Sequence, residues 1–205
     1  GYASLTANTT GHSNVALGAN ALDASTTANH GTAIGFQALT ANTTGAQNTS
    51  VGDRSSITNT TGANNTAVGS LAFYANTTGS TNTAIGGSAL EANTTASNNT
   101  AVGYQSLGAN TTGVNMTAVG YNAGLSHTTG NSSTFIGTDS GKLTTTGVGN
   151  TFVGDGSGRQ NTTGASNVAM GQSALLANTT ANANTAVGYS SLGANTTGTS
   201  NVALG

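Results

Sequence analysis

Glycine recurs at every seventeenth residue along the chain, from Gly1, Gly18 and Gly35 through to Gly205, with no insertion or deletion. Loop lengths vary in ordinary globular domains, so a period this strict indicates that every repeat occupies an equivalent place in a stack. We number the repeat from Asn14 as position 1, which places the recurring glycine at position 5. The unit then reads N-T-A-V-G-x-x-A-L-x-A-N-T-T-G-x-x.

The residue types in this unit favour strands over helices. Position 2 is always Thr or Val and position 4 is always a large apolar residue, which is typical of a short strand. One helix of a helix–turn–helix repeat would also fit, but Gly and Thr recur in every unit and Asn in nearly every one, and all three are poor helix formers. We therefore predict an all-β fold, a parallel β-solenoid (β-roll) of twelve 17-residue coils without terminal caps. Residues 1–205 form a single repeat array, which we expect to be a fragment of a longer repetitive chain.

Side chains alternate between the two faces of a strand, so the strand positions predict which residues face the core and which face water. Positions 2 and 4 share one face of the strand, and position 3, mostly Ala, lies on the other. We expect the large residues of position 4, such as Val102, to face the core, so that Val102→Asp would be severely destabilising. Positions 8 and 9 suggest a second short strand, and Asn-Thr-Thr-Gly reads as a turn. Stacking would align Asn at position 1 and the paired Thr into polar ladders.

Composition narrows the classes of function. Only 32 of 205 residues are Leu, Ile, Val or Phe, so small side chains must build much of the order. A net charge of −2 gives no electrostatic footprint for nucleic acid, and no apolar stretch is long enough for membrane insertion. The chain has no cysteine, which leaves neither a disulfide framework nor a thiolate metal site. All eight charged residues occupy positions 6, 7 or 10, which we expect to face water: Asp23, Asp53, Arg54, Glu91, Asp139, Lys142, Asp155 and Arg159.

The sequence contains no recognisable catalytic set. Three histidines, His12, His30 and His127, fall at different positions of different coils, and we expect them to be solvated. We predict no catalytic, cofactor-binding or metal-binding residue and no enzymatic activity. One stretch, from Tyr121 to Arg159, loses Leu at position 9 and gains Phe at position 3, which indicates either a repacked coil or a small polar binding patch. Its charged residues are Asp139, Lys142, Asp155 and Arg159.

Asn-x-Ser/Thr sequons are abundant, which raises covalent glycans as the one modification the sequence suggests. The alternative is that Asn-Thr-Thr-Gly is simply favourable turn chemistry. Nine sequons share position 12 and would form a row of acceptors: Asn8, Asn42, Asn59, Asn76, Asn93, Asn110, Asn161, Asn178 and Asn195. Others fall elsewhere in the repeat: Asn48, Asn64, Asn98, Asn115 and Asn131.

The recurring N-T-A-V-G of residues 99–103 and 184–188, followed by A-L-x-A-N-T-T-G, resembles head-domain repeats of trimeric autotransporter adhesins. It resembles repeat regions of bacteriophage tail-fibre and bacterial surface-fibre proteins still more closely. The resemblance covers the whole chain, although the adhesin head repeat is shorter than the repeat of this chain. It implies a parallel β-roll, three chains side by side, and a role in attachment.

These observations favour a structural or adhesive fibre that is extracellular or exposed on a surface. A glycan-coated surface filament and an ice-binding solenoid, suggested by the Thr-Thr rows, are the alternatives. We expect a homo-oligomer, a trimer or a filament, in which chains pack through small residues at positions 3, 8 and 11, such as Ala101, Ser106 and Ala109. A cell-surface or carbohydrate receptor is the expected partner, because tyrosines at position 6 could stack on sugars.

Overall fold

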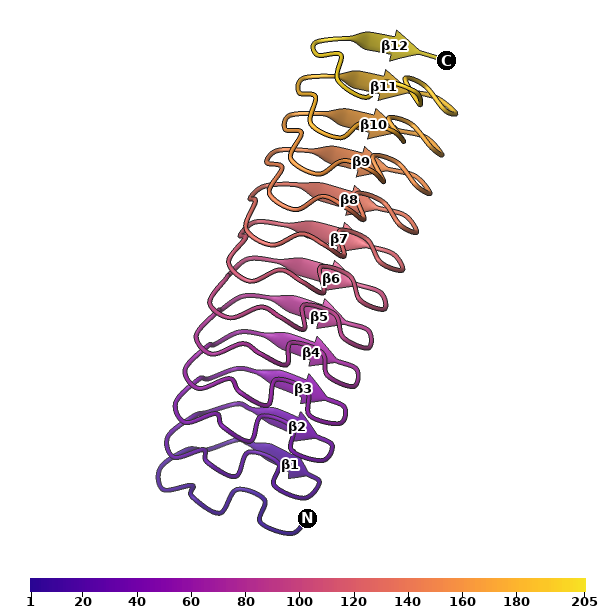
Figure 1. Cartoon of the computed structure of the whole chain (residues 1–205). Helices are drawn as coiled ribbons and strands as arrows, with labels where there is room; N and C mark the ends of the chain where they lie inside the picture. The colour runs from indigo at the N-terminus through magenta and orange to yellow at the C-terminus, as the bar shows by residue number, and fades with distance from the viewer.

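A computed structural model describes residues 1–205 and contains one three-residue strand in each coil. Strands follow one another at a constant interval of one repeat, and Figure 1 shows them stacked as rungs from the N-terminus to the C-terminus. The strands are β1 (Val15–Leu17), β2 (Thr32–Ile34), β3 (Thr49–Val51), β4 (Thr66–Val68), β5 (Thr83–Ile85), β6 (Thr100–Val102), β7 (Thr117–Val119), β8 (Thr134–Ile136), β9 (Thr151–Val153), β10 (Val168–Met170), β11 (Thr185–Val187) and β12 (Val202–Leu204).

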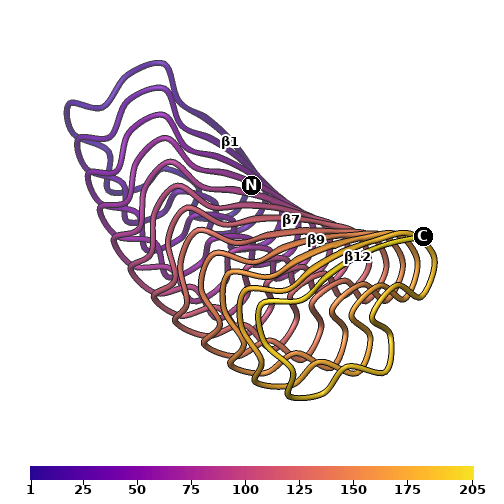
Figure 2. The same cartoon turned by 90° about the horizontal axis from the view of Figure 1, so that it is seen from above.

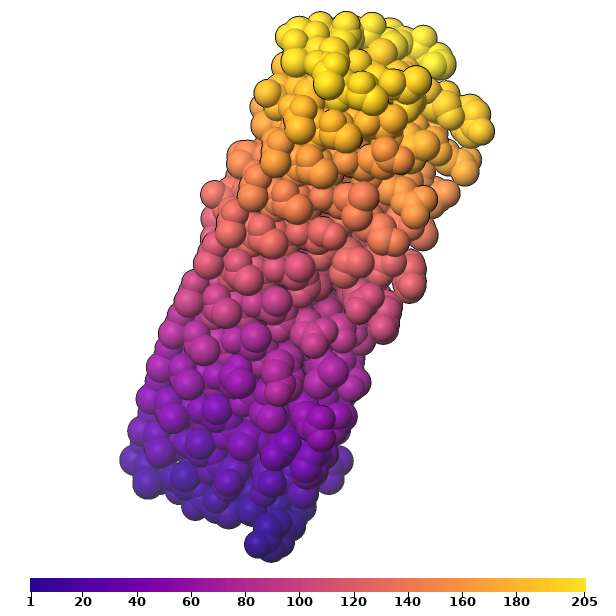
Figure 3. All heavy atoms as spheres, in the orientation of Figure 1, coloured from indigo at the N-terminus to yellow at the C-terminus, as the bar shows by residue number.

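The strands form a single parallel sheet in sequence order, which confirms the all-β, in-register solenoid. Each strand pairs with the equivalent strand of the next coil, so that like positions lie side by side, as when Ala101 of β6 pairs with Ala118 of β7. Because every coil has the same length, this register holds from β1 to β12 without a bulge. Figure 3 shows the resulting rod, with residues in sequence order along its length, and Figure 2 shows successive coils fanning in one rotational sense.

The glycine at position 5 is required by the stacking itself. Gly103 has a φ of 130°, in a region that L side chains rarely adopt. A Cβ placed there would lie 2.4 Å from the carbonyl oxygen of Gly120, the equivalent glycine one coil on. Both the turn and the close approach of consecutive coils therefore exclude a side chain at this position.

The prediction for the two strand faces is wrong. Position 3 lies in the interior: Ala67, Ala84 and Ala101 have no exposed surface, whereas Val68 and Ile85 at position 4 are more than a third exposed. The interior of so short a coil is narrow, and the wall opposite the strand already contributes Leu at position 9. Beside that leucine only a small residue fits at position 3, so the larger residues of positions 2 and 4 point outward.

The predicted second strand is also absent. Residues at positions 7 and 9 adopt positive φ, as at Gln105 (54°) and Leu107 (49°), so this wall is a run of turns. It still bonds coil to coil, since the Leu107 N–H donates to the Ala123 carbonyl at 2.9 Å. The left-handed conformation is unfavourable for a leucine, by roughly 1–2 kcal/mol. Complete burial of the Leu107 side chain offsets that cost.

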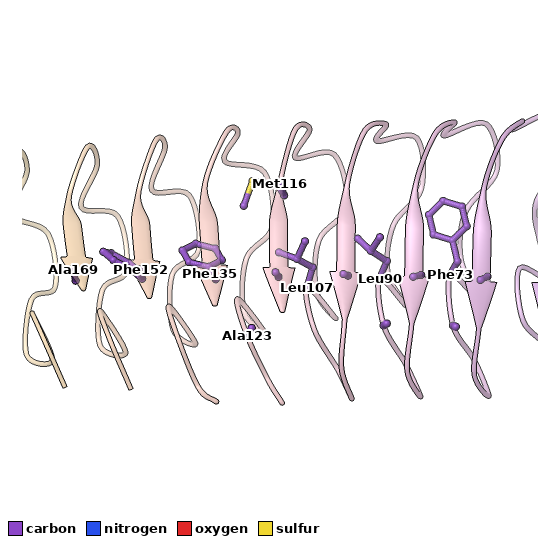
Figure 4. Packing of buried hydrophobic residues seen from close by; sticks show 14 of the residues in the cluster. Phe73, Leu90, Leu107, Met116, Ala123, Phe135, Phe152 and Ala169 are labelled. Atoms are coloured by element: carbon purple, nitrogen blue, oxygen red, sulfur yellow. The ribbon is translucent and has the colours of Figure 1, made fainter. Parts of the chain in front are cut away.

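The core changes composition where the repeat changes. Figure 4 shows Leu90 and Leu107 of position 9 following one another along the interior, and then Phe135 and Phe152 of position 3. In the phenylalanine coils position 9 is glycine: a Cβ on Gly158 would lie 2.5 Å from the Phe152 ring. Positions 3 and 9 therefore share one volume. Most coils fill it with Ala and Leu, the coil of Phe73 with Ala67 and Phe73, and the two phenylalanine coils with Phe and Gly. In the coil of Gly124 the space beside the glycine is taken by the Phe135 ring of the next coil.

Candidate functional surfaces

Most of the nine asparagines of position 12 line the interior of the rod, where neighbouring ones form a hydrogen-bonded ladder. The amide nitrogen of Asn76 donates to Asn59 Oδ1 at 2.7 Å and to the Gly79 carbonyl at 3.1 Å. The Asn76 Oδ1 atom accepts from the Gly79 N–H and from the Asn93 amide. Seven of the nine are buried: Asn42, Asn59, Asn76, Asn93, Asn110, Asn161 and Asn178. Only Asn8 and Asn195, in the first and last coils, keep exposure.

This burial argues against the proposed row of glycans. An N-linked glycan is carried on the amide nitrogen, and in the seven buried residues that nitrogen donates hydrogen bonds inside the coil. A folded rod has no room for a sugar there, so the Asn-Thr-Thr sequence serves folding, as the turn alternative held. Apart from Asn8 and Asn195 in the end coils, exposed sequon asparagines remain only in the opposite loop, at positions 16 and 17: Asn64, Asn98, Asn115 and Asn131.

Two further ladders are present, the predicted one at position 1 and one formed by only the first threonine of each pair, at position 13; the second threonine, such as Thr61, is exposed. At position 1, Asn48 Oδ1 accepts from the backbone N–H of Asn65, whose amide nitrogen crosses the coil to the Gly79 carbonyl at 2.9 Å. At position 13, the Thr60 hydroxyl donates to the Thr77 carbonyl at 2.9 Å. Like residues therefore bond like residues along the rod, which satisfies polar groups that a thin core brings inside.

His127 interrupts the position 12 ladder and is fully buried, contrary to the expectation of a solvated histidine. Its Nε2 atom lies 2.8 Å from the Gly130 carbonyl, and its Nδ1 atom has no partner. Asn110 Oδ1, which would accept from an asparagine at this position, is also unpaired. Burial lowers the pKa of His127 from 6.5, against a smaller raising effect of the Gly130 hydrogen bond. His12 and His30 are exposed as expected, with rings edge to face at 5.2 Å.

The outward side chains of positions 2 and 4 form what we call the strand face, which runs along all twelve strands. It carries no charged residue. Exposed apolar side chains of position 4 include Leu17, Val68, Ile85, Val119, Ile136, Met170 and Leu204. The two positions change together: where position 2 is Thr, position 4 is Val or Ile, and where position 2 is Val, as in β1, β10 and β12, position 4 is Leu or Met. The expectation that position 4 lies inside hid this surface, although the paired choice of residues at positions 2 and 4 was a signal for it.

The charged residues lie on the outer turns, where we predicted them, and none is buried. Asp139 connects two coils, with its carboxylate 3.2 Å from Lys142 Nζ and 3.5 Å from an Arg159 guanidinium nitrogen. It also accepts from the amide of Asn122 at 3.2 Å. Lys142 and Arg159 occupy position 10 of adjacent coils, and this one aspartate offsets the repulsion between the two cations.

Position 6 carries an aromatic pair beside this cluster. The rings of Tyr104 and Tyr121 stack in consecutive coils at a centroid distance of 5.7 Å and an interplanar angle of 13°. Each residue is about half exposed, at 51% and 52%. Another aromatic residue at position 6, Phe36, lies under the guanidinium of Arg54, whose Cζ atom is 5.9 Å from the ring centroid.

The rest of the surface offers no enclosed site. No pocket is present, and no three His, Asp or Glu side chains are grouped closely enough to hold a metal ion. The chain has no helix of the length and apolarity that a membrane span needs. Comparison with models of protein families, with curated proteins and with solved structures gives no match.

Proposed function

We propose that the chain is the shaft of a structural or adhesive fibre, extracellular or surface-exposed, in which parallel copies associate through the strand face. The main support for the proposal is the uninterrupted row of outward-facing Val, Ile, Leu and Met side chains at position 4. The largest contiguous apolar patch on a soluble protein often marks a site of interaction with other proteins. The resemblance of the repeat to adhesin and phage-fibre repeats supports the same assembly.

The size of the strand face suits a stable interface. Twelve parallel strands at about 4.8 Å spacing make a face roughly 55 Å long, and a three-residue strand spans about 10 Å. Covering it would bury about 550 Å² on each chain, or about 1,100 Å² in a pair, just above the lower limit for a specific interface. A second copy also has the same period, so matched side chains would meet in every coil.

This arrangement replaces the association first expected through positions 3, 8 and 11. Ala101 and Ser106 are buried inside the coil, and Ala109 is only partly exposed. The small residues are needed within the chain, which leaves the strand face for contact between chains.

Sedimentation equilibrium of the wild-type chain and of Val102→Asp tests the proposal. We expect an oligomer for the wild type and a shift towards monomer for Val102→Asp, because a charge in the centre of an apolar interface is left unpaired. Val102 faces outward, so the β-type far-ultraviolet spectrum should persist. Thr95→Asp, which places the same charge on an exposed turn, should keep the wild-type mass. A wild-type monomer, or equal masses for the two variants, would refute the proposal.

Ice binding is the second candidate, and the structure moves it to another surface. The Thr-Thr rows first considered lie in turns, but position 2 supplies eight consecutive outward threonines, from Thr32 in β2 to Thr151 in β9. They repeat at the regular spacing of a parallel sheet. Ice binding needs the strand face open, so a soluble monomer with thermal hysteresis would support it. Absence of thermal hysteresis would exclude it.

A further inference from the structure

The turns that follow β6–β9 depart from the repeat on the outside in the same region where the core is repacked. In a chain built from nearly identical coils, this stretch holds four of the eight charged residues: Asp139, Lys142, Asp155 and Arg159. The stacked pair Tyr104 and Tyr121 lies in the two coils before them. We call Tyr104, Tyr121, Asn122, Asp139 and Arg159 the tyrosine–aspartate patch.

The two tyrosines provide an aromatic platform. Their stacking holds both rings in one orientation, so little side-chain entropy is lost when a ligand packs against them. Position 6 of the coil before Tyr104 is Gly87, and a Cβ there would have the Tyr104 ring as its nearest neighbour, at 3.4 Å. The platform is therefore not crowded by a side chain on that side.

Hydrogen-bonding groups continue the platform along the rod. Asp139 holds Lys142, Arg159 and Asn122 in fixed positions at the distances given above. The Arg159 side chain remains 49% exposed, and a guanidinium has five N–H donors, of which a single contact with Asp139 uses only part. Apolar ring faces followed by oriented donors and acceptors match a sugar, whose C–H face is apolar and whose rim carries hydroxyl groups.

Charge and length narrow the ligand further. Two aspartates and two cations in these coils cancel, which favours an uncharged ligand over an acidic one. From the coil of Tyr104 to the coil of Arg159 is three steps of about 4.8 Å, or about 14 Å along the axis. We propose that the tyrosine–aspartate patch binds a neutral oligosaccharide lying along the rod, one sugar against the tyrosines and the next within reach of Asp139 and Arg159. This inference rests on the adhesive role proposed above, for which it names the ligand class.

Saturation-transfer difference NMR with defined probes tests the proposal on the assembled protein. Suitable neutral probes are maltotriose, cellotriose and triacetylchitotriose, with trigalacturonic acid as the acidic probe. We expect at least one neutral trisaccharide to bind at millimolar concentration. Tyr121→Ala should weaken that binding about fivefold, since an aromatic contact of this kind is worth on the order of 1 kcal/mol. Tyr189→Ala, which removes an exposed position 6 tyrosine outside the patch, should leave it unchanged.

Charge supplies a second, independent readout. Asp139→Asn should weaken the neutral probe and strengthen trigalacturonic acid, because Lys142 and Arg159 would then be uncompensated. Failure of every neutral probe, equal losses for Tyr121→Ala and Tyr189→Ala, or preference of the wild type for the acidic probe would each overturn the proposal. Sedimentation on the same samples separates this result from the fibre proposal. A monomer that binds sugar overturns only the assembly, and an oligomer that binds none overturns only the patch.

Discussion

Removing one amide from the middle of the position 12 ladder should cost several kcal/mol. Asn76→Ala deletes four hydrogen bonds, two donated and two accepted. The carbonyl of Gly79 keeps its bond from Asn65, and the amide of Asn93 keeps its bond to Ala96. Two buried groups lose their only partner, Asn59 Oδ1 and the Gly79 N–H.

The magnitude follows from those two orphaned groups. A buried polar atom left without a partner costs about 1–3 kcal/mol, so the two together predict a loss of about 2–6 kcal/mol. The matched control is Asn98→Ala, which changes an exposed asparagine with no side-chain hydrogen bond in the opposite loop. Asn98 has a φ of 63°, and Ala183 occupies the same repeat position at 58°, so the backbone already accommodates alanine there. We expect a change within about 1 kcal/mol for this control.

Urea unfolding followed by far-ultraviolet circular dichroism measures both variants. Because each coil contacts only its neighbours, a weakened coil should also lower the cooperativity between the two halves of the rod. The expected result for Asn76→Ala is a lower midpoint together with a broader or divided transition. Equal midpoints for Asn76→Ala and Asn98→Ala would show that the ladder contributes little, and the reasoning on buried amides would fail.

Three further predictions concern the core. Phe152→Ala should destabilise the rod by about 3–5 kcal/mol. Adding Gly158→Leu should restore much of that loss, because the two changes together recreate the Ala and Leu packing of other coils, and a double-mutant cycle measures the recovery. Burial lowers the pKa of His127, so just below pH 6.5 the unfolded chain binds more protons than the folded chain. The free energy of unfolding should therefore fall as the pH decreases from about 6.5, and should not change with pH in this range in His127→Asn. Equal pH dependence of the two proteins would contradict this. Ala101→Asp should abolish the β-type far-ultraviolet spectrum, whereas Val102→Asp should retain it. The sequence alone predicted that Val102→Asp would be the severe substitution. Retention of the spectrum in both variants would contradict the assignment of position 3 to the interior.

The period determined most of what could be predicted. A constant repeat length permits only equivalent coils, from which the parallel register, the turn at position 5 and the position 1 ladder all follow. These are properties of the backbone and its stacking, and they do not depend on which way a side chain points. The charged residues of positions 6, 7 and 10 all remain unburied, because an unpaired charge is costly to bury in any coil, although position 7 itself is buried at Asn122 and Gly156.

The faces of the strand could not be assigned by the usual rule that large apolar residues lie inside. That rule assumes a core wide enough for large side chains on both walls, and a coil of this size has room on only one. The sequence did contain the decisive clue in another place. Phe135 and Phe152 occur at position 3 in coils whose position 9 is glycine, and this exchange of volume makes sense only if positions 3 and 9 share the interior.

The paired choice on the strand face bears on how copies of the chain align. Side chains open to water have little reason to change together, whereas side chains packed against a common surface must fill it jointly. The Val-x-Leu and Val-x-Met strands are β1, β10 and β12, which are unevenly spaced along the rod. An antiparallel alignment would place β10 against β3, a Thr-x-Val strand, whereas an unshifted parallel alignment places each of the three beside its own counterpart. If the strand face is the interface, its composition therefore favours parallel copies in register. In that arrangement the tyrosine–aspartate patches of all chains lie at the same height on the fibre.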